Sequence, residues 1–218
     1  MSDLPRLLLI ADGFASGRGT GPLAQTAATV RTRTAEAVAA GVRWVMLRDH
    51  AADDATFLRA AARLTERLRD VRPGVRLSVN TRTEAARRLR ADLHVGTRGP
   101  SVAEAVRLGD GDSRLVGFSA HSAREIAEAA RAGAAYATVS PLYRTATHPD
   151  TTPAGLALLR DATEAAPGVP VLALGGITPS RVAECHEAGA HGVAVLSGLL
   201  DAHRIARAVE QYLAALAR

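Results

Sequence analysis

Short apolar runs recur along this chain, and each is followed by a polar or glycine-containing turn and then by a segment with helical periodicity. The eight runs occupy residues 7–10, 44–47, 76–79, 93–95, 115–118, 136–139, 171–174 and 193–196. Between the second and third runs, apolar side chains at positions 57, 58, 61, 64 and 68 share one face of a helix. Eight strand–helix pairs in 218 residues predict an α/β fold, a single (β/α)8 (TIM) barrel that spans residues 1–218 as one domain. An open, doubly wound sheet is the alternative.

Glycines mark the predicted ends of several helices, as at Gly41, Gly133 and Gly189, because glycine readily takes the left-handed conformation that stops a helix. Two longer segments, 13–22 and 143–155, interrupt the rhythm after the first and sixth runs. Both would lie at the carboxyl ends of strands, where barrel enzymes place lids and substrate loops. For the first segment, a lid and a plain surface loop are both open interpretations.

Composition narrows the classes of protein to consider. The single cysteine, Cys185, rules out an intramolecular disulfide and is expected to be a small buried helix residue. No apolar stretch approaches the ~20 residues needed to cross a bilayer, and the N-terminus lacks the basic start of a signal peptide, so we expect a cytoplasmic protein without a membrane partner. The net charge is +5, but all 27 basic residues are arginines spread along helices beside acids, which indicates solvated faces and no nucleic-acid partner. Self-association into a homo-oligomer is left open.

Polar side chains follow the apolar runs, and a barrel would gather them at one mouth. They are rich in hydrogen-bond donors and nearly free of acids: Asp12, Arg48, His50, Asn80, Arg82, Ser119, His121, Ser140, Thr145 and Thr147. Among them, Arg48, Asn80 and Arg82 are expected to contact anionic and amide groups of a ligand. No pair of acids ends neighbouring runs and no Cys/His spacing fits zinc, so the mouth is predicted to work without a metal.

Glycines after the last two runs predict a phosphate site. Gly175 and Gly176 close the seventh run, and Ser197 and Gly198 close the eighth. Barrels commonly bind phosphate with backbone N–H groups of these two loops, and glycine lets an oxyanion approach the backbone. His121 lies just past the fifth run, and an imidazole with an ordinary pKa near 6.5 suits proton transfer at neutral pH. A structural or helix-capping role for His121 is the alternative.

The order and spacing of these strand-end motifs resemble the family of thiamine phosphate synthase and the thiazole tautomerase TenI over nearly the whole chain. The motifs lie at residues 9–12, 46–48, 80–82, 94–96, 117–122, 140–147, 173–177 and 194–198. By this resemblance, the synthase branch joins a pyrimidine diphosphate to a thiazole phosphate and needs magnesium. Thr81 and Gly99 stand where the synthase pattern has two metal-binding aspartates, His50 and His148 replace its lysines, and Ser140 replaces a glycine. A diphosphate leaving group needs a metal or a dense cationic clamp, so these losses count against the synthase reaction.

The tautomerase branch is the closer resemblance, because it keeps the serine–x–His–Ser turn found here at residues 119–122. It implies an isomerase without a cofactor, which holds a small phosphorylated thiazole carboxylate and moves one proton so that the ring becomes aromatic. His121 would then be the general acid/base. The implied ligand contacts are Arg48, Asn80, Ser119, Thr145 and Thr147 for the ring and carboxylate, and Gly175, Gly176, Ser197 and Gly198 for the phosphate. The alternatives are a divergent, magnesium-dependent thiamine phosphate synthase and a non-catalytic regulator that kept the phosphate site.

Overall fold

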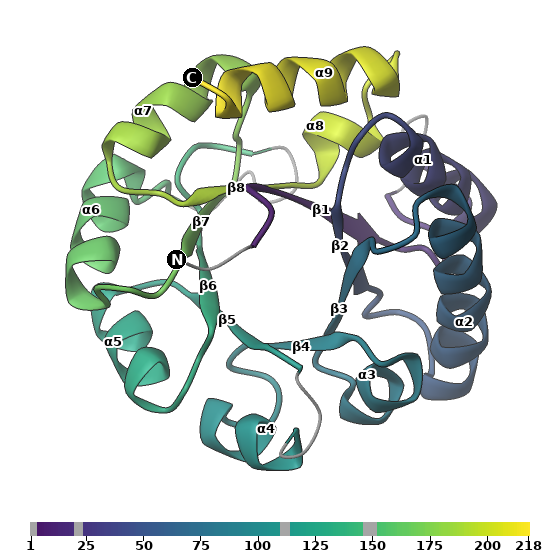
Figure 1. The fold of residues 1–218 in the computed structure, drawn as a ribbon, viewed down its shortest axis with the longest axis horizontal. Coiled ribbons are helices and arrows are strands. Elements are labelled where there is room, and N and C mark those ends of the chain that lie inside the picture. Colours follow the sequence, from purple (N-terminus) through teal and green to yellow (C-terminus); the bar gives the residue numbers. More distant parts are fainter. Residues whose placement is uncertain (1–3, 20–23, 110–113, 146–151) are drawn as a thin grey trace.

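Eight parallel strands close into a barrel in sequence order, with β8 paired to β1 (Figure 1). The computed structural model describes residues 4–19, 24–109, 114–145 and 152–218. The strands are β1 (Leu7–Asp12), β2 (Trp44–Arg48), β3 (Arg76–Asn80), β4 (Asp92–Val95), β5 (Val116–Ala120), β6 (Tyr136–Val139), β7 (Val171–Leu174) and β8 (Gly192–Val195). The predicted (β/α)8 barrel is confirmed, and the doubly wound alternative is wrong.

Helices form a ring outside the strands (Figure 1). They are α1 (Ala27–Ala39), α2 (Asp54–Val71), α3 (Thr83–Leu89), α4 (Val102–Leu108), α5 (Ala123–Arg131), α6 (Gly155–Ala165), the 3-10 turn η2 (Pro179–Arg181), α7 (Val182–Glu187), the single turn α8 (Ser197–Leu200) and α9 (Ile205–Leu216). Helix α2 shows why these segments are helical. Its N-cap Asp53 accepts a hydrogen bond from the Thr56 backbone N–H, and the helix buries Phe57, Leu64 and Leu68 on one face, as the periodicity predicts.

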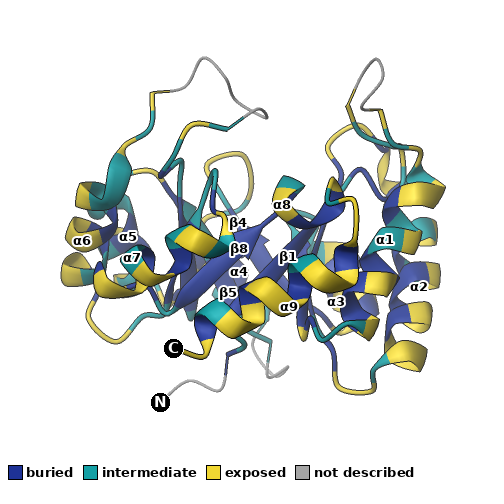
Figure 2. Ribbon diagram, turned by 90° about the horizontal axis from the view of Figure 1, so that it is seen from above, coloured by how far each residue is buried: buried dark blue, intermediate teal, exposed yellow. Residues whose placement is uncertain are grey.

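The loops that follow the strands lie on one side of the barrel. Figure 2 shows the described parts of the loops after β1 and β6 rising above the strands on that side. Parallel strands bring their carboxyl ends to a single rim, so residues far apart in the sequence meet there. None of the described helices is both long enough and apolar enough to span a membrane.

A group of polar side chains occupies the barrel interior beneath the rim. The Trp44 indole Nε1 donates a hydrogen bond of 2.7 Å to Ser78 Oγ, and the Tyr136 hydroxyl donates to the same oxygen over 3.2 Å. The rings of Trp44 and Tyr136 meet edge to face, with centroids 4.6 Å apart. Gly117 on β5 faces Tyr136 on β6, and a Cβ at position 117 would lie 2.1 Å from Tyr136 Cζ. Only glycine therefore leaves room for this ring.

Candidate active site

Arg48 is held at the rim by Asp12. The two residues are paired in register at the ends of β1 and β2, and Arg48 Nε lies 2.8 Å from Asp12 Oδ1. Both side chains are about a quarter exposed. An anchored guanidinium loses less conformational entropy when it binds an anion than a free one would. Arg48 therefore occupies the position that the sequence predicts for an anion contact.

Asn80 and Ser119 lie on either side of His94. Asn80 pairs with His94 across β3 and β4, and its Nδ2 is 3.5 Å from the His94 carbonyl oxygen, at the limit of a hydrogen bond. The Ser119 hydroxyl oxygen lies 2.8 Å from His94 Nε2 and 3.4 Å from Thr138 Oγ1. Asn80 and Ser119 are half-buried, whereas His94 is only 1% exposed. The two predicted ligand contacts thus border the buried interior.

His121 is exposed, and its ring is fixed from one side. Its Nδ1 lies 2.8 Å from the Ser140 carbonyl oxygen, and because a carbonyl can only accept, Nδ1 carries the proton. The neutral ring then has its lone pair on Nε2, which is the tautomer a general base requires. Ser122 is the N-cap of α5, accepting from the Glu125 backbone N–H, while the Glu125 carboxylate accepts from the His121 backbone N–H. The capping residue is therefore Ser122, and the His121 imidazole is left for another role.

Gly175 and Gly176 have positive φ angles of 97° and 67°, and the loop after β6 packs directly on them. The Tyr143 backbone N–H donates to the Gly175 carbonyl over 3.0 Å. A Cβ at Gly175 would lie 2.9 Å from Pro141 Cα, and one at Gly176 would lie 2.7 Å from the Arg144 carbonyl oxygen. Both glycines are thus required by backbone conformation and by this loop, apart from any contact with a ligand.

Ser197 and Gly198 begin the single-turn helix α8, next to the loop after β7. The Tyr212 hydroxyl, from α9, donates to the Ile177 carbonyl over 2.8 Å. A Cβ at Gly198 would lie 2.3 Å from that hydroxyl oxygen. Tyr212 therefore ties together the two loops in which the sequence predicts a phosphate site. Phosphate binding there stays a prediction.

The remaining residues predicted at the mouth occupy different surroundings. Arg82 was expected at the mouth, and this expectation is wrong: its guanidinium pairs with Asp54, donates to the Asp49 carbonyl over 3.1 Å and lies 4.5 Å from the Phe57 ring centroid. It braces the loop before α2. His50 is exposed, Thr145 is half-buried at the rim loop after β6, and Thr147 and His148 lie outside the described residues.

Asp49 organises the start of the loop after β1, a role that the sequence analysis missed. Its buried carboxylate accepts from the backbone N–H groups of Ala15 and Ser16 and from the Ser16 hydroxyl. Burial opposes ionisation of this group, but the hydrogen bonds from Ser16, Ala15 and Ala52 outweigh it, so the pKa of Asp49 is lowered. Arg18 also pairs with Asp201 beyond α8. The described part of segment 13–22 is therefore anchored at both β2 and α8.

The residues present do not fit the magnesium ion that the family resemblance implies. Thr81 and Gly99 are neighbours, since a Cβ at Gly99 would lie 3.1 Å from Thr81 Cγ2. The two positions therefore meet in space. Thr81 supplies only a hydroxyl group and Gly99 has no side chain, whereas magnesium prefers carboxylate oxygens. Within the described parts of the chain, no three His, Cys, Asp or Glu side chains are grouped to hold a metal ion.

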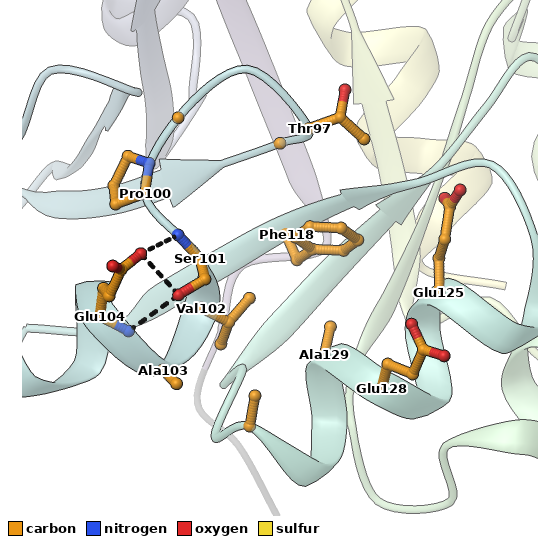
Figure 3. Close-up of a pocket in the computed structure, with 13 residues that line it drawn as sticks. Thr97, Pro100, Ser101, Val102, Ala103, Glu104, Phe118, Glu125, Glu128 and Ala129 are labelled. Atoms are coloured by element: carbon orange, nitrogen blue, oxygen red, sulfur yellow. Dashed lines mark hydrogen bonds between the residues drawn. The ribbon is translucent and has the colours of Figure 1, made fainter.

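A cavity of about 480 Å³ lies outside the barrel, between the loop before α4 and helix α5. Figure 3 shows Phe118 at its centre and Glu104, Glu125 and Glu128 around it. Glu104 is engaged with Ser101 in a capping box at the start of α4. The cavity borders Thr97 on the rim loop, but it contains none of the side chains predicted to bind the ligand.

Comparisons with known proteins relate the chain to one family. Residues 20–199 match the family model described as thiamine monophosphate synthase. The thiamine-phosphate synthase of Chloroflexus aurantiacus is 37% identical over 177 residues, which cover 80% of this chain and 80% of that protein. The thiamine-phosphate synthase of Thiobacillus denitrificans is 37% identical over 177 residues, covering 80% of this chain and 82% of that protein. A thiamine phosphate pyrophosphorylase structure from Pyrococcus furiosus has a TM-score of 0.80 at 22% identity, over 97% of this chain and 95% of that one, and supports the fold.

Proposed function

This chain belongs to the thiamine monophosphate synthase family, and we propose that it is a thiamine-biosynthetic isomerase, a thiazole tautomerase. Its substrate would be a phosphorylated thiazole carboxylate bound at the carboxyl ends of the strands. The reaction removes one proton from a ring carbon and places it on a carbon outside the ring, without a metal, so that the ring becomes aromatic. Family membership supports the thiamine pathway, and the choice of reaction rests on the residues of the rim.

The observation that carries the choice of reaction is the contact between Thr81 and Gly99. In the synthase pattern these positions hold two metal-binding aspartates, and here they meet without a carboxylate. Departure of a diphosphate develops several negative charges, which must be neutralised by a metal ion or by several cations. A proton transfer develops far less charge, so it tolerates the loss of both acids.

The rim residues have separate roles in this proposal. His121, with its lone pair on Nε2, takes the proton from a ring carbon and returns it to a carbon outside the ring, and such help is typically worth ~10² to 10⁴ in rate. Arg48 pairs with the substrate carboxylate, and Asn80, Ser119, Thr145 and Thr147 orient the ring. Backbone N–H groups at Gly175, Gly176, Ser197 and Gly198 bind the phosphate.

A second candidate, the magnesium-dependent thiamine phosphate synthase, is favoured by the names of the relatives. The curated relatives compared above are thiamine-phosphate synthases, and the comparisons support this candidate better than the tautomerase. It requires that cations of the rim, such as Arg48, replace the missing carboxylate–magnesium site. The third candidate, a regulator without activity, predicts ligand binding with no turnover of either substrate.

One experiment separates the three candidates. The purified protein is assayed side by side for thiazole tautomerisation and for condensation of the two synthase substrates, each with added magnesium and with EDTA. We expect tautomerisation that is unaffected by EDTA, and a loss of at least about tenfold in His121→Ala. Magnesium-dependent condensation would replace the tautomerase with the synthase. Binding of the thiazole phosphate by calorimetry without either reaction would leave the regulator.

A further inference from the structure

A continuous series of hydrogen bonds runs from Ser119 at the rim into the barrel interior. Ser119 Oγ lies 2.8 Å from His94 Nε2, and His94 Nδ1 lies 3.2 Å from the Tyr136 hydroxyl oxygen. The Tyr136 hydroxyl in turn donates to Ser78 Oγ, which also accepts from the Trp44 indole. Four strands, β2 to β4 and β6, thus supply side chains that support one hydroxyl group on β5.

The donors and acceptors of this series can be assigned from its buried end. Tyr136 gives its only hydroxyl hydrogen to Ser78, so its oxygen is an acceptor for His94. Nδ1 of His94 must then carry the proton, and Nε2 bears the lone pair. Ser119 consequently donates its only hydroxyl hydrogen to Nε2. Any group of a ligand that contacts Ser119 meets an oxygen that can only accept.

The pair formed by Ser119 and His94 has the geometry of an activated nucleophile and its base. Its electrostatics contradict that role. Burial, with a smaller contribution from the positive charge of Arg48, lowers the pKa of His94 to about 3. At pH 7 the protonated imidazole is then populated at only about one part in 10⁴. His94 is therefore too weak a base to take the Ser119 proton, and the pair needs another explanation.

We propose that His94 is a positioning residue, which fixes the Ser119 hydroxyl as a hydrogen-bond acceptor for the ligand. Tyr136 sets the tautomer of His94, and Gly117 leaves the space in which the Tyr136 ring lies. On the rim side, the charge of Arg48 acts on His94, and Arg48 is itself paired with Asp12. The proposal rests on the proposed function only in that Ser119 contacts the substrate.

The hydrogen-bond assignment is tested without substrate, by NMR of the full chain labelled with ¹⁵N in histidine. Between pH 5 and 8 we expect His94 to show a protonated Nδ1 and an unprotonated Nε2, with no titration; the His94 signals are identified by their loss in His94→Gln. Tyr136→Phe removes the hydroxyl but keeps the ring, and we expect it to release the tautomer to a mixture. A protonated Nε2, or titration in this range, would overturn the proposal even if the enzyme proved to be a tautomerase.

The positioning role is tested by a double-mutant cycle on the active enzyme. Ser119→Ala and His94→Gln should each raise KM by about three- to tenfold, the range of one hydrogen bond, and the double variant should be no worse than either one. The pH profile of kcat should remain that of the wild type. Effects that multiply in the double variant, or a shifted pH profile, would show that His94 does not act through Ser119. If the wild type turns over no substrate, the proposed function fails, and the NMR result decides this inference alone.

Discussion

Substitution of Gly117 by alanine should damage the barrel more than any other single methyl group added to β5. The new Cβ would lie 2.1 Å from Tyr136 Cζ and 2.5 Å from both neighbouring ring carbons, so the ring has to move. Tyr136 is fully buried, and the Trp44 ring lies against it at 4.6 Å. Overpacking of this kind typically costs about 1–3 kcal/mol. The hydrogen bond that Tyr136 donates to Ser78 and the one that it accepts from His94 are lost as the ring shifts, at about 1 kcal/mol each.

We therefore expect Gly117→Ala to lower the free energy of unfolding by about 3–5 kcal/mol, a large share of the 5–15 kcal/mol typical of a domain. The assay is urea denaturation followed by far-ultraviolet circular dichroism at pH 7. Gly109→Ala is the matched control: Gly109 has a φ of −97°, and the nearest atom to an added Cβ is 3.5 Å away. It should stay within about 0.5 kcal/mol of the wild type. A loss below about 1 kcal/mol in Gly117→Ala would refute the described packing of Tyr136.

Three further predictions follow from single groups. Because the pKa of His94 is lowered in the folded chain, only the unfolded chain binds a proton at this residue between pH 7 and pH 5. The free energy of unfolding should therefore fall by about 2 kcal/mol from pH 7 to pH 5. His94→Gln should remove this pH dependence in urea titrations. For Asp49 the lowered pKa means that the ionised carboxylate stabilises the fold above about pH 4. The loss of stability in Asp49→Asn, relative to the wild type, should therefore become smaller as the pH falls below that value. Thr81 has a φ of 58°, a conformation that asparagine adopts more readily than a β-branched residue. Thr81→Asn should therefore increase stability by about 1 kcal/mol and raise the thermal unfolding midpoint. An unchanged midpoint would contradict this strain.

The strands and the closed barrel were predictable because their signal is local and repeated. Eight apolar runs with turns and helical segments between them leave few ways to bury every run. Cys185 was expected to be a small buried helix residue because free cysteines usually are, and its buried position in α7 confirms this. Convergence of Arg48, Asn80, Ser119 and His121 at one rim followed from the fold alone, because parallel strands end on one side.

What the sequence did not reveal depends on which way a side chain turns. Arg82 follows Asn80 by two positions, yet its guanidinium leaves the mouth for Asp54 and the Phe57 ring, and that choice depends on where α2 packs. Asp49 follows Arg48 directly in the sequence, and nothing in the sequence indicates that its buried carboxylate accepts hydrogen bonds from the loop after β1. The contact between Gly117 and Tyr136 had no sequence signal either, since it arises from the register of β5 against β6.

The hydroxyl of Tyr212 links α9 to two loops of the rim. This residue lies in the last helix of the chain, yet it bonds the Ile177 carbonyl and touches Gly198, so the loops after β7 and β8 depend on it. Both loops precede α9 in the sequence, so they reach their final positions only when this later helix packs against them. Ordering of the rim after β7 and β8 is therefore coupled to the docking of α9.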